Sequence, residues 1–499
     1  MKRNRKFSLE RLEDRQLMAG DLAVNAFANL DLTFERNIPV VPAVPAFSSN
    51  SGAAATLYLD FNGHFEAQWG NHSNALTPVF SIDADATTFS STELATIKEV
   101  WQRVSEDFAP FNINVTTVDP GDFSNGKALR VAIGGSWQDW YGNSAGGVGR
   151  FGSFTSVDPN VVYVFREANF YSAKGFAGTV SHEAGHAFGL YHQSSFDANG
   201  DVIEEYRSGT DQKGPIMGTH RVSVRTTWAY GQSSYLDSDK NVIYAGMQDD
   251  MAVIASNTNG FGYRPDDFGG NTYDAYLMGN LSSYGPISNI GGIIGKTSDA
   301  DWFQFNVMTN GRLSLQANVA TVGANLDAKL SLFRLEHHLV NGKPVFNFTQ
   351  VAMSDPATSL NASLAANLTT GTYIAVVSSH GEYGDVGQYT LQGSFSQPLV
   401  VNRGLIAGQL LTAMPSIAPT TSTVVQPTLM ASSSVNSSAQ LLAAPAPNRI
   451  TSPVLQSTTN LATTSVSMRA AAVDEAFTSG VRVKSHKLPA ELLDLLAAA

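Results

Sequence analysis

Two histidines and a glutamate stand within five residues of one another, in the segment HEAGH that begins at His182. If residues 175–189 form a helix, His182 and His186 project from the same face one turn apart, so that both imidazoles can bind one cation. Glu183 lies beside this pair, and its carboxylate can reach a water at the metal instead of the metal itself. The spacing therefore predicts a zinc site in which Glu183 is the catalytic general base.

The residues after this segment provide a turn and a third ligand. Gly189 lacks a Cβ atom and can take a left-handed conformation, which ends the helix and reverses the chain. His192 then returns toward the other two histidines, and the fourth position at the metal stays open for water. The predicted Zn²⁺ ligands are therefore His182, His186 and His192, and Gly189 has a predicted structural role.

A methionine in a turn rich in glycine and proline follows downstream. The segment GPIMG (residues 214–218) places Met217 where a tight turn is expected. Together, the pattern HExxHxxGxxH and this methionine resemble the metzincin clan of zinc endopeptidases. The resemblance implies hydrolysis of a protein or peptide substrate, with Met217 as a structural, hydrophobic floor beneath the metal. Gln193 matches none of the residues that mark the best-known branches of the clan, and Thr219 stands where some branches have a tyrosine, so the branch stays open.

Composition restricts the class of protein. A chain of 499 residues is too long for one compact core, and its hydrophobic content of 43% can fill two or three domains. The formal net charge of −12 argues against a nucleic-acid partner. The absence of cysteine excludes disulfides and a thiolate-ligated zinc. No run approaches the roughly 18 apolar residues of a membrane span, so none is predicted.

The N-terminal residues 1–20 begin with basic side chains but lack the apolar stretch of a standard signal peptide. They resemble a short segment with leucine, glutamate and arginine that heads many large bacterial surface and secreted proteins. Together with the peptidase motif, this resemblance predicts an export-type segment and a secreted or extracellular protein, or one held at the cell surface. Residues 21–54 are rich in alanine, proline, serine and asparagine and are predicted to be a linker or pro-segment.

The zinc motif is expected to lie in a domain that spans residues 55–260. Ser90 and Glu93 form a predicted capping box ahead of a helix that continues to Phe108, and residues 248–256 are expected to be a closing helix. Strands are predicted at residues 56–61, 111–117, 128–135 and 160–165. This order resembles the upper half of a metzincin. The predicted fold is therefore an α+β metzincin-like catalytic domain, a twisted mixed sheet with long helices, followed by an all-β sandwich domain.

The segment Gly147 to Gly152 matches the dinucleotide-binding pattern GxGxxG. It leads into a predicted strand, so a pyrophosphate would find no helix N-terminus there. We interpret the segment instead as an edge strand beside the cleft, where an extended substrate can pair with it.

Alternation with period two predicts a β-sandwich over residues 263–397. The strands are expected at residues 302–307, 311–319, 326–333, 371–379 and 387–395. The runs YRPDDFGGNT, SDADWFQF, LTTGTYIAVV and GQYTLQGSF resemble the bacterial pre-peptidase C-terminal domain. That resemblance implies a domain that binds calcium, a polymer or a surface, or that assists secretion.

Two groups of acidic residues are candidates for Ca²⁺. Within the predicted sandwich, the candidate oxygens belong to Asp266, Asp267, Asp299 and Asp301, although capped turns explain aspartates at strand ends equally well. Residues 197–201 place acidic and amide side chains at alternate positions but lack the glycine and glutamate of a calcium loop, which favours a polar turn.

Residues 398–470 are predicted to be a disordered linker rich in serine, threonine, proline and alanine, and residues 471–499 a tail with a short helix. The sequence as a whole predicts a secreted zinc-dependent endopeptidase. Two alternatives stay open: a surface adhesion or binding protein with a structural zinc, and a zinc hydrolase that acts on another kind of bond.

Overall fold

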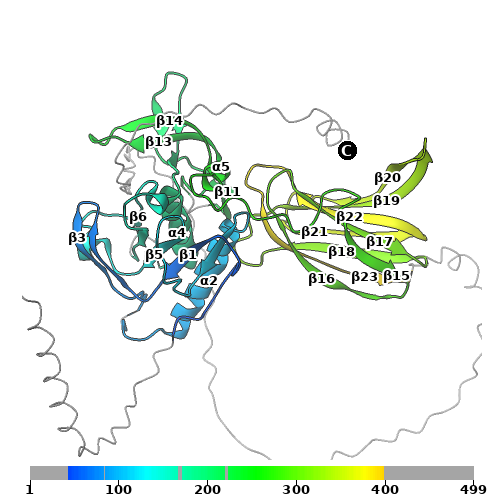
Figure 1. Cartoon of the computed structure of the whole chain (residues 1–499), viewed down its shortest axis with the longest axis horizontal. Coiled ribbons are helices and arrows are strands. Elements are labelled where there is room, and N and C mark those ends of the chain that lie inside the picture. The colour runs from blue at the N-terminus through cyan, green and yellow to red at the C-terminus, as the bar shows by residue number, and fades with distance from the viewer. Residues whose placement is uncertain (1–42, 84, 167–170, 220–222, 398–499) are drawn as a thin grey trace, which may run out of the picture.

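The computed structural model describes residues 43–397, except residues 84, 167–170 and 220–222 (Figure 1). The predicted export segment, most of the predicted linker before residue 55, and the two predicted C-terminal regions lie outside the described residues. Residues 43–54 lie against the first sheet, where Ser48 forms a bridge with Thr116 and the ring of Phe47 stacks on Trp101 at 4.8 Å.

The predicted α+β fold with long helices is wrong, because strands predominate. Strands account for 44% of the described residues and helices for only 13%. The α-helices of the described chain are short: α2 (Ser91–Asp107), α3 (Trp137–Trp140), α4 (Ala173–Ala187) and α5 (Asp250–Ile254). Between His192 and Asp249 the described residues form strands and no helix, and the sequence analysis predicted no strand there. The sandwich adds nine further strands, and every helix of the described residues ends at or before Ile254.

A five-stranded central sheet carries the first half of the molecule. Its order is β4 (Ile113–Thr116), β1 (Ala55–Asp60), β5 (Ala128–Ile133), β7 (Val161–Val164) and β6 (Gly147–Val148). The first four strands are parallel, whereas β6 runs antiparallel to β7 at the edge. These strands consist largely of apolar residues and are buried, as expected for parallel strands with both faces covered.

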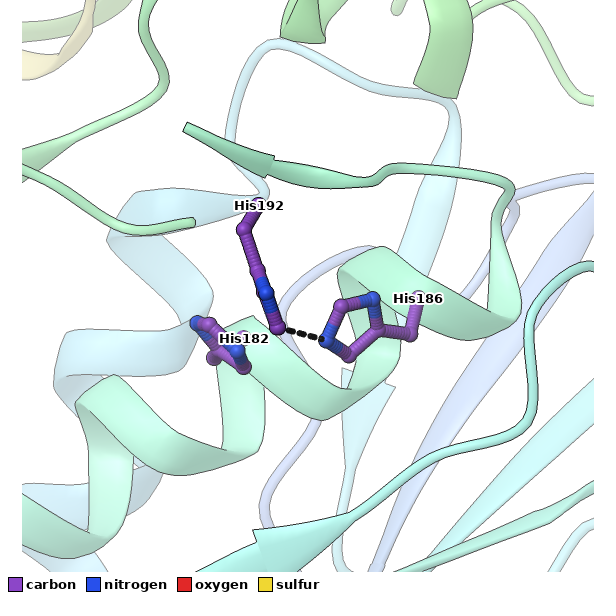
Figure 2. A group of neighbouring side chains, drawn as sticks. All are labelled: His182, His186 and His192. Carbon is purple, nitrogen blue, oxygen red and sulfur yellow. Dashed lines mark hydrogen bonds between the residues drawn. The ribbon is translucent and has the colours of Figure 1, made fainter. Parts of the chain in front are cut away.

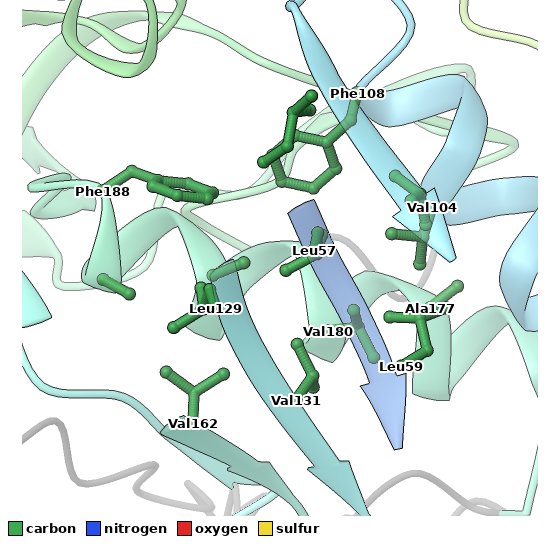
Figure 3. Packing of buried hydrophobic residues seen from close by; sticks show 14 of the residues in the cluster. Leu57, Leu59, Val104, Phe108, Leu129, Val131, Val162, Ala177, Val180 and Phe188 are labelled. Carbon is green, nitrogen blue, oxygen red and sulfur yellow. The ribbon is translucent and has the colours of Figure 1, made fainter. Parts of the chain in front are cut away.

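Helices α2 and α4 pack together against one face of this sheet. Their apolar side chains meet those of the strands in one core, and each fully buried leucine or valine contributes about 1.5–3 kcal/mol. Figure 3 shows side chains of this core: Leu57, Leu59, Leu129, Val131 and Val162 from the sheet, Val104 and Phe108 at the end of α2, and Ala177 and Val180 from α4.

The start of α2 confirms the predicted capping box. The Ser90 hydroxyl accepts from the Glu93 backbone N–H at 3.3 Å, and the Glu93 carboxylate accepts from the Ser90 N–H at 2.7 Å. Such a box satisfies two backbone donors that the first turn leaves without helical partners. Glu93 also accepts from the N–H of Ile82, which ties the helix to the preceding loop.

Four further groups of paired strands precede residue 263. Strand β8 (His192–Gln193) pairs with β13 (Tyr230–Leu236), which forms a hairpin with β14 (Val242–Asp249). The other short strands form pairs: β2 (His64–Trp69) with β3 (His72–Thr77), β9 (Ser195–Phe196) with β10 (Val202–Glu204), and β11 (Lys213–Pro215) with β12 (Arg225–Thr227).

Residues 263–397 form two antiparallel-rich sheets that face each other around a second core, here called the sandwich. One sheet has the order β15 (Tyr276–Leu281), β17 (Ala300–Val307), β22 (Gly371–Ser379), β19 (Ala328–Val340) and β20 (Lys343–Ser354). The other has the order β16 (Gly285–Ile294), β23 (Gly387–Ser396), β18 (Gly311–Val319) and β21 (Ala362–Leu368). Side chains along β17 and β18 alternate between buried and half-buried, which is the two-residue period of a one-sided strand.

The two bodies lie side by side, with α2, β11 and α5 next to the sandwich (Figure 1). We call the first of them, described residues 43–262, the N-terminal body. In the part of the chain that the structure describes, no helix has the length and apolar character needed to cross a bilayer.

Candidate metal centre

Helix α4 positions two of the predicted ligands and the predicted base. His182, Glu183 and His186 are all buried in its last two turns, and the two histidine rings approach each other with centroids 4.8 Å apart (Figure 2). The helix begins at Ala173, where the Ser172 hydroxyl accepts from the N–H of Gly175. Four-residue spacing on a helix accounts for the shared face.

A glycine ends α4 and reverses the chain. Gly189 has a φ of +92°, in the left-handed region that side chains with a Cβ rarely adopt. The Gly189 N–H donates to the His186 carbonyl and the Leu190 N–H to the Gly185 carbonyl, each at 2.9 Å, which satisfies orphan carbonyls of the last turn. Three residues later the chain enters β8 at His192.

The structure brings the three histidines together. One ring nitrogen from each lies within 4.8 Å of the others, and the Nε2 atoms of His186 and His192 are 3.2 Å apart (Figure 2). Two ligands of a tetrahedral Zn²⁺ with bonds of about 2.0–2.1 Å lie about 3.3–3.4 Å apart. The donor set and its spacing therefore fit a zinc ion held by His182, His186 and His192.

Backbone carbonyls orient two of the rings. Nδ1 of His182 lies 2.9 Å from the Ile216 carbonyl, and Nδ1 of His186 lies 2.8 Å from the Leu190 carbonyl. A proton on each Nδ1 donates to the carbonyl and leaves the Nε2 lone pair available to a metal. Nδ1 of His192 is buried and has no hydrogen-bond partner among the described residues.

Burial favours the neutral imidazole at His186 and His192. Burial and, to a smaller extent, the charge of the neighbouring His182 lower the pKa of His186 to about 3. The pKa of His192 is lowered well below its usual value by burial and by the charges of the other two histidines. Neutral imidazoles are the form that binds a metal ion.

Glu183 is buried beside the triad, with 5% of its surface exposed. Burial raises the pKa of its carboxyl to about 8. A cation held by the triad would favour the ionised form and lower that pKa, because opposite charges at short range stabilise each other. The carboxylate that a general base requires therefore depends on an adjacent cation.

Two glycines of the predicted edge strand make room for Glu183. A Cβ atom on Gly147 would lie 2.7 Å from Cγ of Glu183, and one on Gly149 would lie 3.2 Å from its Oε2. The GxGxxG segment thus lies against the predicted base, at the edge of the central sheet, and not at the start of a helix. Close approach, and not phosphate binding, explains these glycines.

Met217 is fully buried beneath the metal-binding helix. A Cβ atom on Gly185 would lie 2.5 Å from its Sδ atom, so the thioether rests on α4 between the two helical histidines. The Met217 carbonyl accepts from the N–H of Gln193 at 2.7 Å, which joins the turn to β8.

Gln193 and Tyr206 are two residues of the site that sequence reasoning did not find. Gln193 is fully buried, donates to the Asp250 carboxylate at 2.7 Å, and accepts from the Arg207 guanidinium at 3.1 Å. The ring of Tyr206 contacts that of His192, with centroids 4.3 Å apart. Gln193 directly follows His192, which was a local signal for it, but its partners come from distant segments. Tyr206 reaches the site only through packing, which no local sequence signal encodes.

A second group of possible metal ligands lies in the sandwich. Carboxylate oxygens of Asp266, Asp267 and Asp301 lie within 4.8 Å of one another. Asp301 is fully buried, one of its oxygens accepts from the Tyr389 hydroxyl, and the other has no partner among the described residues. Asp299, the fourth predicted oxygen donor, instead accepts from the Gly295 N–H at 2.7 Å.

The acidic residues 197–201 form an exposed turn between β9 and β10. The Asp197 carboxylate accepts from the N–H groups of Asn199 and Asp201 at 2.8 and 2.9 Å. These hydrogen bonds explain the residue types as turn chemistry.

Comparisons with known proteins give limited similarity. No protein-family model matches the chain, and no curated protein matches it. Among solved structures, the pre-peptidase C-terminal domain of a collagenase from Bacillus anthracis is similar to 27% of this chain and is covered over 98% of its own length, at 17% identity and a TM-score of 0.17. A β-glucosidase from Paenibacillus barengoltzii is similar over 28% of this chain and 15% of its own, at 10% identity and a TM-score of 0.12. Scores this low assign no function.

Proposed function

We propose that this chain is a zinc-dependent endopeptidase in which Glu183 is the general base. One observation carries the proposal: three buried imidazoles converge, the pair of His186 and His192 has a spacing that suits Zn²⁺, and a buried carboxylate lies next to them. The pattern HExxHxxGxxH and the turn methionine, which resemble those of metzincins, support peptide bonds as the substrate.

The chemistry divides between the metal and the chain. When bound, Zn²⁺ supplies a Lewis acid that acidifies water and polarises a carbonyl. Glu183 accepts the proton of the attacking water and then delivers it to the leaving amine. The Ile216 and Leu190 carbonyls hold the His182 and His186 rings in the tautomer that ligation requires.

An adhesion or binding protein with a structural zinc is the second candidate. The observation in its favour is burial, since His182, His186 and His192 are only 7%, 3% and 2% exposed, whereas a catalytic zinc keeps an open position. Against it stands Glu183, because a structural site needs no carboxylate at that place.

Digestion of an unfolded protein by the full-length chain tests the two candidates. We expect the zinc-loaded chain to cleave it, a chelator to stop cleavage, and restored Zn²⁺ to recover it. Glu183→Ala should lower turnover by about 10²–10⁴-fold and still bind Zn²⁺, because the carboxylate is not a ligand. The matched control is Glu99→Ala, a partly exposed glutamate on α2, which should leave turnover unchanged.

The outcomes separate the candidates. Cleavage that survives both the chelator and Glu183→Ala would contradict the proposed mechanism. A folded wild type that holds Zn²⁺ and cleaves no peptide bond would favour the binding protein. Hydrolysis of a non-peptide ester or amide, without cleavage of protein, would instead identify a different zinc hydrolase.

The proposal extends to location and to a second cation. The N-terminal segment resembles that of exported bacterial proteins, which supports a secreted or cell-surface enzyme. Ca²⁺ is the cation that suits the sandwich cluster, because Asp266, Asp267 and Asp301 offer only oxygen ligands. The sandwich is further proposed to bind a polymer or a surface.

A further inference from the structure

Two loops of the sandwich are buried against the N-terminal body. They are the β18–β19 loop (residues 320–327) and the β22–β23 loop (residues 380–386). Asn325 in the first loop and Asp385 in the second are 3% and 0% exposed. Val386 belongs to the same hydrophobic core as the central sheet, although it lies in the chain segment of the sandwich. The sandwich therefore contributes to the interior of the N-terminal body.

The first loop is connected to the metal-binding helix by hydrogen bonds. The Asn325 side-chain amide donates to one oxygen of the Asp107 carboxylate at 2.7 Å. The other oxygen of Asp107 accepts from the Ser181 hydroxyl at 2.6 Å. Ser181 directly precedes His182 on α4, and both contacts are buried. Asp107 thus joins the sandwich to the backbone that carries the first ligand.

The second loop is connected to the strand that leads into the methionine turn. One oxygen of Asp385 accepts from the Lys213 ammonium at 2.7 Å and from the Arg225 guanidinium at 2.9 Å. Lys213 lies on β11 and Arg225 on β12, and these two strands pair in parallel. Strand β11 ends at Pro215, one residue before Ile216, whose carbonyl meets Nδ1 of His182. The contacts that begin at Asn325 and those that begin at Asp385 therefore both lead to His182.

Glycines allow the loops to approach this closely. A Cβ atom on Gly384 would lie 2.4 Å from the Trp228 carbonyl oxygen, and one on Gly387 would lie 2.1 Å from Oε1 of Glu106. At both glycines there is no space for even one methyl group, so the loops and the N-terminal body pack as closely as residues in a protein interior. It differs from the loose, polar contact expected between two domains joined by a linker.

We propose that Asp385 and Asn325 of the sandwich are positioning residues of the metal centre. This inference rests on the proposed function, because it concerns the geometry of the same zinc site. Asp385 fixes β11 and hence the Ile216 carbonyl, which holds the His182 ring. Asn325 holds the Asp107 carboxylate in place, and Asp107 in turn holds Ser181, which directly precedes His182 on α4. The sandwich is therefore part of the enzyme's working structure and not a separable module.

Zinc affinity in the full-length chain tests the inference. We would measure the apparent Kd for Zn²⁺ by competition with a chromophoric chelator in wild type, Asp385→Asn and Asn325→Ala. Both variants should bind Zn²⁺ at least about 10-fold more weakly, the effect typical of losing a group that orients a metal ligand. With Co²⁺ in place of Zn²⁺, their visible absorption should lose the tetrahedral signature. For peptide cleavage, kcat should fall while KM stays constant.

Tyr284→Phe is the matched control. The Tyr284 hydroxyl donates to the Asn310 carbonyl at 3.0 Å, so the hydrogen bond that this variant loses lies within the sandwich. This variant should keep the wild-type Kd for Zn²⁺. Asp385→Glu, which keeps the carboxylate, should recover part of the affinity that Asp385→Asn loses.

Thermal unfolding of the metal-free proteins shows which variants are folded. Asp385→Asn removes the buried carboxylate that Lys213 and Arg225 share. If this variant does not fold, Asn325→Ala and Lys213→Met decide the question. Folded variants with wild-type Kd would overturn the inference, as would a Tyr284→Phe variant that is weakened equally. A wild type that binds no Zn²⁺ would overturn the proposed function and this inference together. A wild type that binds Zn²⁺ tightly beside unaffected variants would overturn only the inference.

Discussion

At the scale of single residues, the smallest side chains decide where the reactive ones lie. Gly147 and Gly149 leave space that the Glu183 side chain fills, and Gly185 leaves space for the Met217 thioether. In each place a single methyl group would come within 2.5–3.2 Å of the functional side chain. The position of the base is therefore set as much by absent side chains as by contacts.

Replacement of Gly149 by alanine should impair catalysis without removing the metal. The new Cβ would lie 2.7 Å from the Glu183 carbonyl oxygen, 3.2 Å from its Oε2 and 3.3 Å from Cβ of His186, so the backbone and the carboxylate of Glu183 must both shift. A displacement of about 1 Å at a catalytic group can lower turnover by about 10²-fold. We expect that loss in kcat, with Zn²⁺ still bound in a one-to-one ratio. Gly52→Ala, which meets open space, is the control, and equal kcat in both variants would contradict the prediction.

The site could be predicted from sequence only where the spacing is local. His182 and His186 share a face because a helix fixes the geometry of residues four apart, and Gly189 reverses the chain as its type suggested. The partners of Gln193 and the contact between Tyr206 and His192 depend on how separate segments pack, which spacing does not encode.

At the scale of elements, sequence periodicity identified the individual strands better than the fold class. The strands predicted at 128–135 and 160–165 correspond to β5 and β7. The fold class was wrong because strands of two or three residues, such as β8 and β11, are too short to show any period. The strands β13 and β14, YGQSSYL and VIYAGMQD, do not alternate in sequence, although the turn at Asp237 between them was a signal that the sequence analysis did not use.

The end of α2 should make stability depend on pH. Burial raises the pKa of Glu106 from 4.5 to about 7, so the folded state favours the protonated carboxyl. The stability that Glu106 contributes is complete below pH 4.5 and is lost as the pH rises to about 7, above which no further change occurs. The total change is of the order of 3 kcal/mol, from the value of 1.36 kcal/mol for each pKa unit.

Glu106→Gln isolates this contribution. We would measure the free energy of unfolding by urea between pH 4.5 and 8 for the metal-free wild type and variant. The difference, wild type minus variant, should fall as the pH rises toward 7 and then stay level. Asp122→Asn, an exposed aspartate, serves as the control and should give a difference with no such fall. Parallel curves for wild type and Glu106→Gln would contradict the prediction.

At the scale of the whole molecule, two possible cation sites lie in separate hydrophobic cores. The histidine triad belongs to the N-terminal body, whereas the aspartate cluster lies at the start of the sandwich, so each ion would stabilise a different part. Because the sandwich loops reach into the N-terminal body, stabilisation of the sandwich should also protect the metal centre.

Ca²⁺ should therefore stabilise the full-length chain through the sandwich, independently of Zn²⁺. Burial and the neighbouring carboxylates raise the pKa of Asp301 to about 8, and a divalent cation relieves this repulsion when it binds the ionised groups. At a Ca²⁺ concentration of about 100 times the Kd, the gain is about 2.7 kcal/mol, which calorimetry would detect as a rise of a few degrees in Tm. Because binding requires ionised carboxylates, the rise in Tm should be larger at pH 9 than at pH 6.

Asp301→Asn should abolish this rise in Tm, whereas Asp197→Asn, in the exposed turn of the N-terminal body, should leave it intact. A rise that survives Asp301→Asn would place the Ca²⁺ elsewhere and contradict the assignment of this cluster.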